Sequence, residues 1–299
     1  MSWPSVNIIL STYNGSLYIK EQLESLYAQD YPNLKIFVRD DGSSDSSLEI
    51  LRAESAKGRL TLFDGQNIGI FNSFLELLKI AAPADYYALC DQDDIWLPNK
   101  VSKAISKLKD QKSPALYCSS LMLVDSELKE LKQFAYDDAI GFKNSIFTNC
   151  ATGCSCVFNI ALKDLFIRTK DPSKIIMHDW WLYIIASAFG EVIYDKDYYI
   201  LYRQHANNQI GMQSIFKIFK NRLFRLFVCS QVPNRFSQVT EFKATYGSIL
   251  KNDITNYLNK IIDNQNTFYG RLYIALRLRP ARKYISQNVS SFFLTLFKH

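Results

Sequence analysis

Short apolar runs alternate with stretches of helical periodicity over the first hundred residues. Each run has the length of a buried strand and is followed by polar residues. The runs are Val6–Leu10, Leu34–Val38, Leu60–Phe63 and Tyr86–Leu89. The intervening stretches carry apolar residues at helical spacing. Ser16 is placed to cap the first helix, and Ser43, Ser44 and Asp45 offer cap oxygens for the second. Strands and helices that alternate in this way predict an α/β fold with a mostly parallel sheet.

The pattern changes after residue 100. The expected elements are a strand at Ala115–Val124, a loop or strand with a glycine turn at Asn149–Phe158, an apolar helix from His178 to about Ala188, and two strand-like runs within Glu191–Tyr202. From about Gln213 onward the pattern is helical and basic.

Three polar clusters directly follow apolar strands in the first part of the chain. They are Thr12-Tyr13-Asn14, Asp40-Asp41 and Asp91-Gln92-Asp93-Asp94. Parallel sheets bind ligands beyond the carboxyl ends of their strands, so we expect these clusters to meet at one edge of the sheet. This convergence predicts the active site.

The composition fits one globular domain with an appendage. The chain has 299 residues, of which 48% are hydrophobic and 21% are charged. No apolar run reaches the roughly 18–20 residues of a membrane span, and the first residues show no signal-peptide core, which predicts a cytoplasmic protein. The six cysteines lack paired zinc-ligand spacing and are expected to be buried free thiols.

Charge divides the chain into two parts. Residues 212–299 hold 14 Lys and Arg against 3 Asp and Glu, a net charge of +11, whereas residues 1–211 carry −5. We therefore predict a catalytic domain at 1–211 and a basic helical region at 212–299. Within that region, Ile215–Phe227 suits a helix lying on an anionic membrane, with a packed subdomain or dimer surface as the alternative. The acidic first part and the lack of any nucleic-acid motif argue against a nucleic-acid partner.

The cluster Asp91–Asp94 places three carboxylates within four residues. Their mutual repulsion favours a bound cation, and oxygen ligands suit Mg²⁺ or Mn²⁺; a solvated acidic turn is the alternative. A carboxylate of Asp40 or Asp41 could accept hydrogen bonds from a base or a ribose, although Asp-Gly turns are common. The sequence lacks both glycine-rich phosphate loops, G-x-G-x-x-G and G-x-x-x-x-G-K-[ST], which disfavours dinucleotide-binding and P-loop enzymes.

Two further positions are candidates for catalysis. Asp179 lies at an expected helix start, where the helix dipole by itself favours an ionised carboxylate; it could be a general base or only a cap. Trp180 and Trp181 beside it could stack on a sugar, with one of them expected in the core. His205 could complete the coordination of a metal held by Asp91 and Asp93, or be structural.

At these residues the chain resembles glycosyltransferase family 2, and within it the bacterial polysaccharide rhamnosyltransferases. The resemblance rests on five pieces that keep their order: Val6–Gly15, Arg39–Asp45, Cys90–Lys100, Met177–Trp180 and Leu201–His205. It implies a GT-A fold and direct, inverting transfer of a sugar from a nucleotide carrier. One departure is Cys154-Ser155-Cys156, which stands where small or apolar residues are expected.

The resemblance also implies a role for each candidate residue. It assigns nucleotide binding to Thr12, Tyr13, Asn14, Asp40, Asp41 and Asp91, the metal to Asp91, Asp93 and His205, the catalytic base to Asp179, and acceptor contacts to Gly153 and Trp180.

The resemblance further implies dTDP-rhamnose as the expected donor and a lipid-linked glycan as the expected acceptor, at the cytosolic face of a membrane. A UDP-sugar donor is an alternative within the same fold. Two other classes remain: a nucleotidyltransferase, which would carry a glycine-rich loop after the first strand, and a non-catalytic membrane-binding module, which would have lost its acidic clusters.

Overall fold

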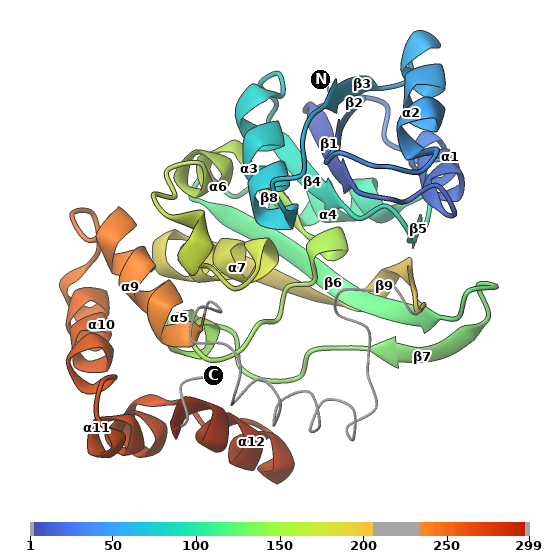
Figure 1. Cartoon of the computed structure of the whole chain (residues 1–299). Coiled ribbons are helices and arrows are strands. Elements are labelled where there is room, and N and C mark those ends of the chain that lie inside the picture. The colour runs from blue at the N-terminus through green and yellow to red at the C-terminus, as the bar shows by residue number, and fades with distance from the viewer. Residues whose placement is uncertain (1–2, 206–233, 297–299) are drawn as a thin grey trace.

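The computed structural model describes residues 3–205 and 234–296. Its strands form one nine-stranded sheet in the order β3-β2-β1-β4-β8-β6-β9-β5, with β7 paired to β6 (Figure 1). The strands are β1 (Val6–Thr12), β2 (Leu34–Asp40), β3 (Thr61–Asp64), β4 (Tyr86–Cys90), β5 (Ile95–Trp96), β6 (Ala115–Val124), β7 (Glu130–Phe134), β8 (Val157–Asn159) and β9 (Glu191–Arg203).

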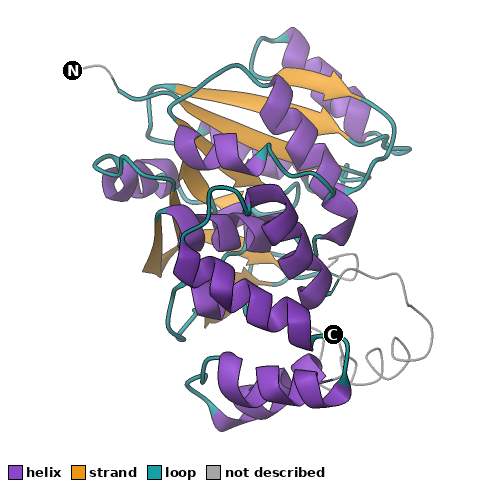
Figure 2. Ribbon diagram, turned by 90° about the vertical axis from the view of Figure 1, so that its left-hand side faces the viewer, coloured by secondary structure: helices purple, strands orange, loops and turns teal. Residues whose placement is uncertain are grey.

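Helices cover the sheet and form the C-terminal part of the described chain (Figures 1 and 2). They are α1 (Ile19–Tyr27), α2 (Ser47–Ala56), α3 (Ile70–Ile80), α4 (Lys100–Leu108), α5 (Phe142–Ser145), α6 (Ile160–Phe166), α7 (His178–Phe189), α9 (Arg235–Tyr246), α10 (Asn252–Asn264), α11 (Phe268–Tyr273) and α12 (Ile285–Leu296). Short 3₁₀ turns form η1 (Gly153–Ser155) and η2 (Pro172–Lys174), and η3 (Ile274–Leu278) is a π-helical turn.

The first four strands, β1 to β4, form the parallel half of the sheet, as the alternation of strands and helices predicts. β1 pairs in parallel with β2 and β4, and β2 pairs with β3. Successive side chains of a strand point to opposite faces. Ile9 accordingly packs in one core cluster, whereas Ile8 and Leu10 pack in the other. Helices cover both faces, which is why these strands read as continuous apolar runs.

In the second half of the sheet, β6 and β9 run in the same direction as β4, although the antiparallel strand β8 lies between β4 and β6. β8 is antiparallel to both β4 and β6, so β6 runs in the direction of β4, and β9 is parallel to β6. The carboxyl ends of β1, β2, β4 and β9 therefore share one edge. The two expected strand-like runs within Glu191–Tyr202 are one strand, whose register with β6 shifts twice near Ser120.

The predicted start of the first helix is wrong. α1 begins at Ile19, Ser16 makes no cap, and Leu17 is 73% exposed. The backbone N–H of Ser16 instead donates to Asp45 Oδ2, 3.0 Å away, because residues 12–16 are bonded to the loop after β2. Asp45 also accepts a hydrogen bond from the backbone of Ser47, at the start of α2.

The described C-terminal helices share a core with the sheet-bearing part. Phe236, Phe242 and Tyr246 of α9 belong to the same buried cluster as Trp181 of α7. The division at residue 211 stays a prediction, and the predicted interfacial helix at 215–227 lies outside the described residues. No described helix has the length and apolar character that crossing a membrane requires.

Candidate active site

The loop after β1 is held against the acidic loop after β4. Gln92 Oε1 accepts hydrogen bonds from the Thr12 hydroxyl at 2.7 Å and from the Tyr13 backbone N–H at 2.8 Å. Asn14 has a positive φ of 50°, and its side-chain oxygen accepts from the Ser44 backbone N–H at 2.8 Å. The three polar clusters thus meet at the carboxyl edge of the sheet.

The carboxylates of Asp40 and Asp41 are buried and already accept hydrogen bonds from neighbouring residues at this edge. Asp40 accepts from the backbone N–H and the hydroxyl of Ser43 at 2.8 and 2.6 Å. Asp41 accepts from the backbone of Ile68 and Gly69, both at 3.0 Å, and pairs with Arg39. Both carboxylates therefore order the loops around the candidate nucleotide site, and a carboxylate has lone pairs for further donors.

Asp93 and His205 meet across the edge. His205 Nε2 lies 2.8 Å from Asp93 Oδ2, and the imidazole stacks on Tyr18 at 4.9 Å between ring centroids. Asp91 lies nearby and is partly buried. Burial, together with the charges of Asp93 and Asp179, raises its pKa to about 7. Asp93 and His205 are therefore in contact, and Asp93 and Asp179 both lie near enough to Asp91 for their charges to affect its pKa.

Asp179 lies in the first turn of α7, as predicted, but the net effect on its pKa is opposite to the expected helix effect. Burial raises the pKa to about 6, against hydrogen bonds from the backbone of Trp180 and Gly153 and from the side chain of Asn149, which lower it. Asn149 Nδ2 donates to Asp179 Oδ1 at 3.1 Å. Desolvation outweighs the effect of the helix N-terminus here because the residue as a whole is only 7% exposed.

Gly153 lies where His178 and Asp91 approach one another. A Cβ at this glycine would stand 2.8 Å from His178 Nε2 and 3.8 Å from Asp91 Oδ2. His178 is buried and stacks on Phe74 at 4.4 Å between centroids, and burial lowers its pKa to about 3. A neutral imidazole and a side-chain-free turn therefore form one wall of the site.

The two tryptophans have different surroundings. Trp180 is partly buried, and its indole N–H donates to the Ser145 carbonyl at 2.6 Å. Trp181 is fully buried and donates to the Thr169 hydroxyl at 2.8 Å. The expectation that one of them belongs to the core is confirmed for Trp181.

The donor set fits a hard divalent cation. Asp91, Asp93 and His205 offer carboxylate oxygens and an imidazole. Burial is the main cause of the raised pKa of Asp91, the charges of Asp93 and Asp179 add to it, and a bound cation would favour the ionised carboxylate. Among the described residues, however, the group whose ligand atoms all lie within 4.8 Å of one another is Asp91 with Asp94 and Cys154. Burial raises the pKa of the Cys154 thiol well above its usual range, and Asp94 Oδ1 accepts from the Arg203 backbone, so this group suits a hard cation less well.

The described cysteines are buried free thiols, as predicted: Cys90, Cys118, Cys150, Cys154 and Cys156. Burial raises the pKa of Cys154 and Cys156 well above the usual thiol value. The Cys154-Ser155-Cys156 departure therefore leaves protonated core thiols behind the site.

Sequence patterns missed residues that hold the site together. Arg203 is 2% exposed and donates to the Asp93 carbonyl at 3.0 Å, to the Ser126 carbonyl at 2.7 Å and to Glu21. Gln92 bridges two loops, and Asn149 orients Asp179. Gln92 and Arg203 both stand inside the sequence pieces that signalled the family, but only their contacts reveal their roles.

The family model for glycosyl transferase family 2 matches residues 7–164. The chain is also 31% identical to dTDP-rhamnosyl transferase RfbG of Shigella flexneri, over 72% of this chain and 78% of that protein. The chain belongs to glycosyl transferase family 2. It is a glycosyltransferase, and the predicted family is confirmed.

Other relatives and solved structures agree with this assignment. An uncharacterized glycosyltransferase of Rickettsia typhi is 28% identical over 68% of this chain and 64% of its own length. S. aureus TarS 1-349, in complex with UDP-GlcNAc, superposes with a TM-score of 0.58 at 18% identity, over 98% of this chain and 81% of that one. Mannosyltransferase PcManGT from Pyrobaculum calidifontis, in complex with GDP-Man and Mn²⁺, has a TM-score of 0.53 at 16% identity, over 99% and 74%. The predicted GT-A fold is confirmed.

Proposed function

We propose that this enzyme transfers a sugar from a nucleotide carrier to an acceptor hydroxyl, with inversion and with the aid of Mg²⁺ or Mn²⁺. The observation that carries the proposal is the gathering of Asp91, Asp93, Asp179 and His205 at one sheet edge. These residues come from three distant segments of the chain and combine a cation site with a base.

Asp93, Asp91 and His205 would hold the divalent ion. The ion would neutralise the negative charge that builds on the leaving diphosphate. Arg203 and Tyr18 keep Asp93 and His205 in place on the protein side. The Mn²⁺ that PcManGT binds together with GDP-Man supports such an ion in this fold.

Asp179 would take the proton from the attacking acceptor hydroxyl. A pKa near 6 keeps the carboxylate ionised at neutral pH and still basic enough to accept a proton. One displacement with one base inverts the anomeric centre, so no second carboxylate is needed as nucleophile. Gly153 and Trp180 would line the acceptor side.

The proposed donor is dTDP-rhamnose, on the strength of the Shigella flexneri relative. Thr12, Tyr13 and Asn14 would face the nucleotide, on loops that Asp40 and Asp41 order. A UDP-sugar donor is the second candidate, supported by the TarS complex with UDP-GlcNAc. Family membership sets the nucleotidyltransferase alternative aside.

The proposed acceptor is a lipid-linked glycan of a bacterial surface polysaccharide such as O-antigen. This acceptor would place the enzyme in the cytoplasm, bound peripherally to the membrane. The excess of basic residues after residue 211 supports an anionic partner for this part of the chain.

Thermal unfolding with a panel of nucleotide sugars tests the donor. A ligand that binds only the folded state raises the midpoint. We expect a shift with dTDP-rhamnose that requires Mg²⁺ or Mn²⁺; a shift only with a UDP-sugar would replace the donor, and no shift with any donor would contradict the proposal.

Asp93→Ala tests the metal role in the same assay. The metal-dependent part of the shift should disappear, while Asp110→Ala, which removes an exposed carboxylate near the end of α4, should leave it unchanged. An unaltered metal-dependent shift in Asp93→Ala would remove Asp93 from the metal site.

A further inference from the structure

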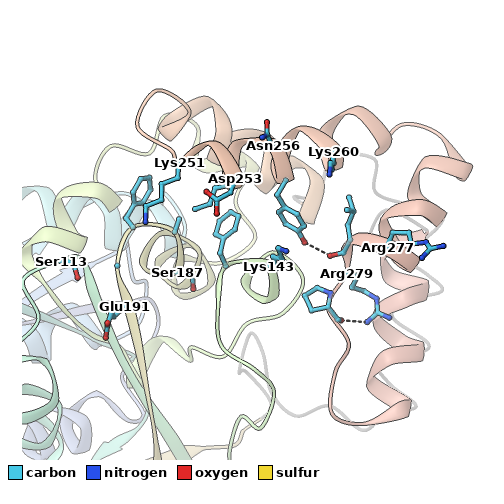
Figure 3. Close-up of a pocket in the computed structure, with 18 residues that line it drawn as sticks. Ser113, Lys143, Ser187, Glu191, Lys251, Asp253, Asn256, Lys260, Arg277 and Arg279 are labelled. Carbon is cyan, nitrogen blue, oxygen red and sulfur yellow. Dashed lines mark hydrogen bonds between the residues drawn. The ribbon is translucent and has the colours of Figure 1, made fainter.

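A second recess lies away from the catalytic edge. It has a volume of about 950 Å³ and is bounded by α5, the end of α7, the start of β9, α10 and η3 (Figure 3). Asp179 is at the start of α7 and Ala188 near its end, so the length of the helix separates the two sites by roughly 15 Å. A ligand in this recess, which we call the basic groove, would not compete with the sugar donor.

The groove collects cations that have no ionic partner among the described residues. Its lining includes five of them: Lys143, Lys251, Lys260, Arg277 and Arg279. In the part of the chain that the structure describes, no acidic side chain pairs with any of the five, whereas the neighbouring Arg282 and Lys283 pair with Asp138 and Asp137. The two neighbouring cations are thus neutralised by ion pairs, whereas the five that line the groove are not neutralised by any described residue.

The two acidic lining residues do not cancel this charge. Glu191 and Asp253 leave a net charge of +3 over the lining. Figure 3 shows Lys260, Arg277 and Arg279 toward one end and Glu191 toward the other. Burial and the charge of Arg282 lower the pKa of Arg279, which means that an anion at this end would relieve an unfavourable charge.

An exposed apolar stripe adjoins the basic end. Tyr269 is 81% exposed, Tyr273 40% and Leu276 63%, and their spacing of four and three residues places them on one side of α11 and η3. Arg277 directly follows Leu276. Exposed aromatic and aliphatic side chains beside Lys and Arg are typical of a surface that enters the interface of an anionic membrane.

We propose that the basic groove binds the phosphate of an anionic phospholipid head group, while Tyr269, Tyr273 and Leu276 enter the lipid interface beside it. This refines the peripheral membrane attachment in the proposed function by placing it on described residues. Guanidinium and ammonium groups match phosphate oxygens, and the aromatic walls formed by Phe142 and Tyr257 suit the glycerol region of a lipid.

The test is sedimentation with vesicles of phosphatidylcholine, with and without phosphatidylglycerol. Wild type should bind only the anionic vesicles, and less tightly as salt rises. Lys260→Glu/Arg277→Glu should weaken binding by about tenfold or more, because each basic residue near the surface contributes on the order of 1 kcal/mol. The matched control is Lys103→Glu/Lys107→Glu, with the same change of charge at exposed positions of α4.

A second variant isolates the apolar stripe. Tyr273→Ser/Leu276→Ser changes no charge and should weaken vesicle binding even where added salt has removed the electrostatic part. Equal losses in the two charge-reversal variants, or no loss in the groove variant, would overturn the proposal. Binding of inorganic pyrophosphate that depends on Lys260 and Arg277, without vesicle binding, would indicate a soluble phosphate ligand and would also overturn it.

The membrane proposal and the sugar transferase proposal can fail independently, and the two measurements distinguish these failures. The groove variant should keep the metal-dependent thermal shift with donor, because the groove is remote from Asp93. Vesicle binding without any donor shift would leave the groove assigned and contradict the sugar transferase proposal. A donor shift without vesicle binding would support the sugar transferase proposal and contradict the assignment of the groove.

Discussion

Asp179 shows how strongly a residue's surroundings decide its chemistry. Its place at a helix start favours the charged carboxylate, but burial prevails and raises the pKa to about 6. The folded protein therefore holds a proton on this carboxylate in a pH range where the unfolded chain has released it. The base becomes active only as that proton leaves.

The pH dependence of transfer follows from this shift. We expect kcat to rise about tenfold per pH unit below about 6 and to level off above it, because Asp179 must be ionised to accept a proton. In Asp179→Asn, transfer should fall by about two to four orders of magnitude, the rise should vanish and donor binding should survive. Near-normal turnover in that variant would remove Asp179 as the base.

The pH dependence of stability should have the opposite sign. A carboxyl with a raised folded-state pKa contributes stability that is present at low pH and is lost as pH rises through about 6. Urea unfolding of wild type and Asp179→Asn between pH 4 and 7 measures this contribution. A difference between the two proteins that does not change with pH would contradict it.

Gly153 is expected to tolerate no side chain. Gly153→Ala brings a Cβ to 2.8 Å from His178 Nε2, so the imidazole must move and disturb the wall beside Asp91. We expect loss of transfer activity together with a lower midpoint of thermal unfolding. If the clash is the cause, the loss of stability on Gly153→Ala should be smaller in a His178→Ala background; an equal loss in both backgrounds would contradict this explanation.

At the scale of elements, the site depends on loops that are bonded to one another. The loop after β1 is joined to the loop after β4 by Gln92 and to the loop after β2 by Asn14 and Ser16. Each loop follows a strand that is fixed in the sheet, so the strands set the position of the loops and the side chains set their shape.

Gln92→Ala should loosen the nucleotide side of the site. It removes the acceptor of two hydrogen bonds from Thr12 and Tyr13, and we expect KM for the donor to rise about tenfold with a smaller change in kcat. The matched control is Gln29→Ala, which removes a glutamine that bonds Ser25, Leu97 and Val101. That variant should lose stability without a change in KM, and equal KM in both variants would contradict the role of Gln92.

At the scale of the whole molecule, the described C-terminal helices and the sheet-bearing part have one core. Phe242 is fully buried between Trp181, at 5.6 Å between ring centroids, and Tyr246, at 5.0 Å. The helix that carries Asp179 therefore rests on the C-terminal part. If η3 and α11 contact a membrane, they do so from the same group of C-terminal helices that packs against α7.

Phe242→Ala should destabilise the entire chain. Loss of a buried phenylalanine costs about 3–5 kcal/mol of the free energy of unfolding, and tryptophan fluorescence and circular dichroism should still report one transition in urea. Phe268→Ala, at a half-exposed position of α11, should cost far less. Two separate transitions, with only the first one shifted, would show that the C-terminal helices unfold independently.

Local patterns in the sequence determined the strands, the strand-helix alternation and the polar clusters at the strand ends. These features follow from the periodicity of side chains in a strand or helix and from the residues that end it, so a short window of sequence suffices. The family motifs are equally local. The predicted start of α1 failed because hydrogen bonds from a loop after another strand set it, and no window around Ser16 contains that loop.

Only the tertiary structure decided which atoms meet and which are already bonded. Asp93 and His205 are 112 residues apart in the chain, and the carboxylate of Asp41 is bonded to Arg39, Ile68 and Gly69. Burial set the direction of the Asp179 pKa shift, and the placing of α5, α10 and η3 around one recess gathered the cations of the groove. Desolvation and Coulomb interactions depend on distance through space, and the order of residues in the chain does not contain that distance.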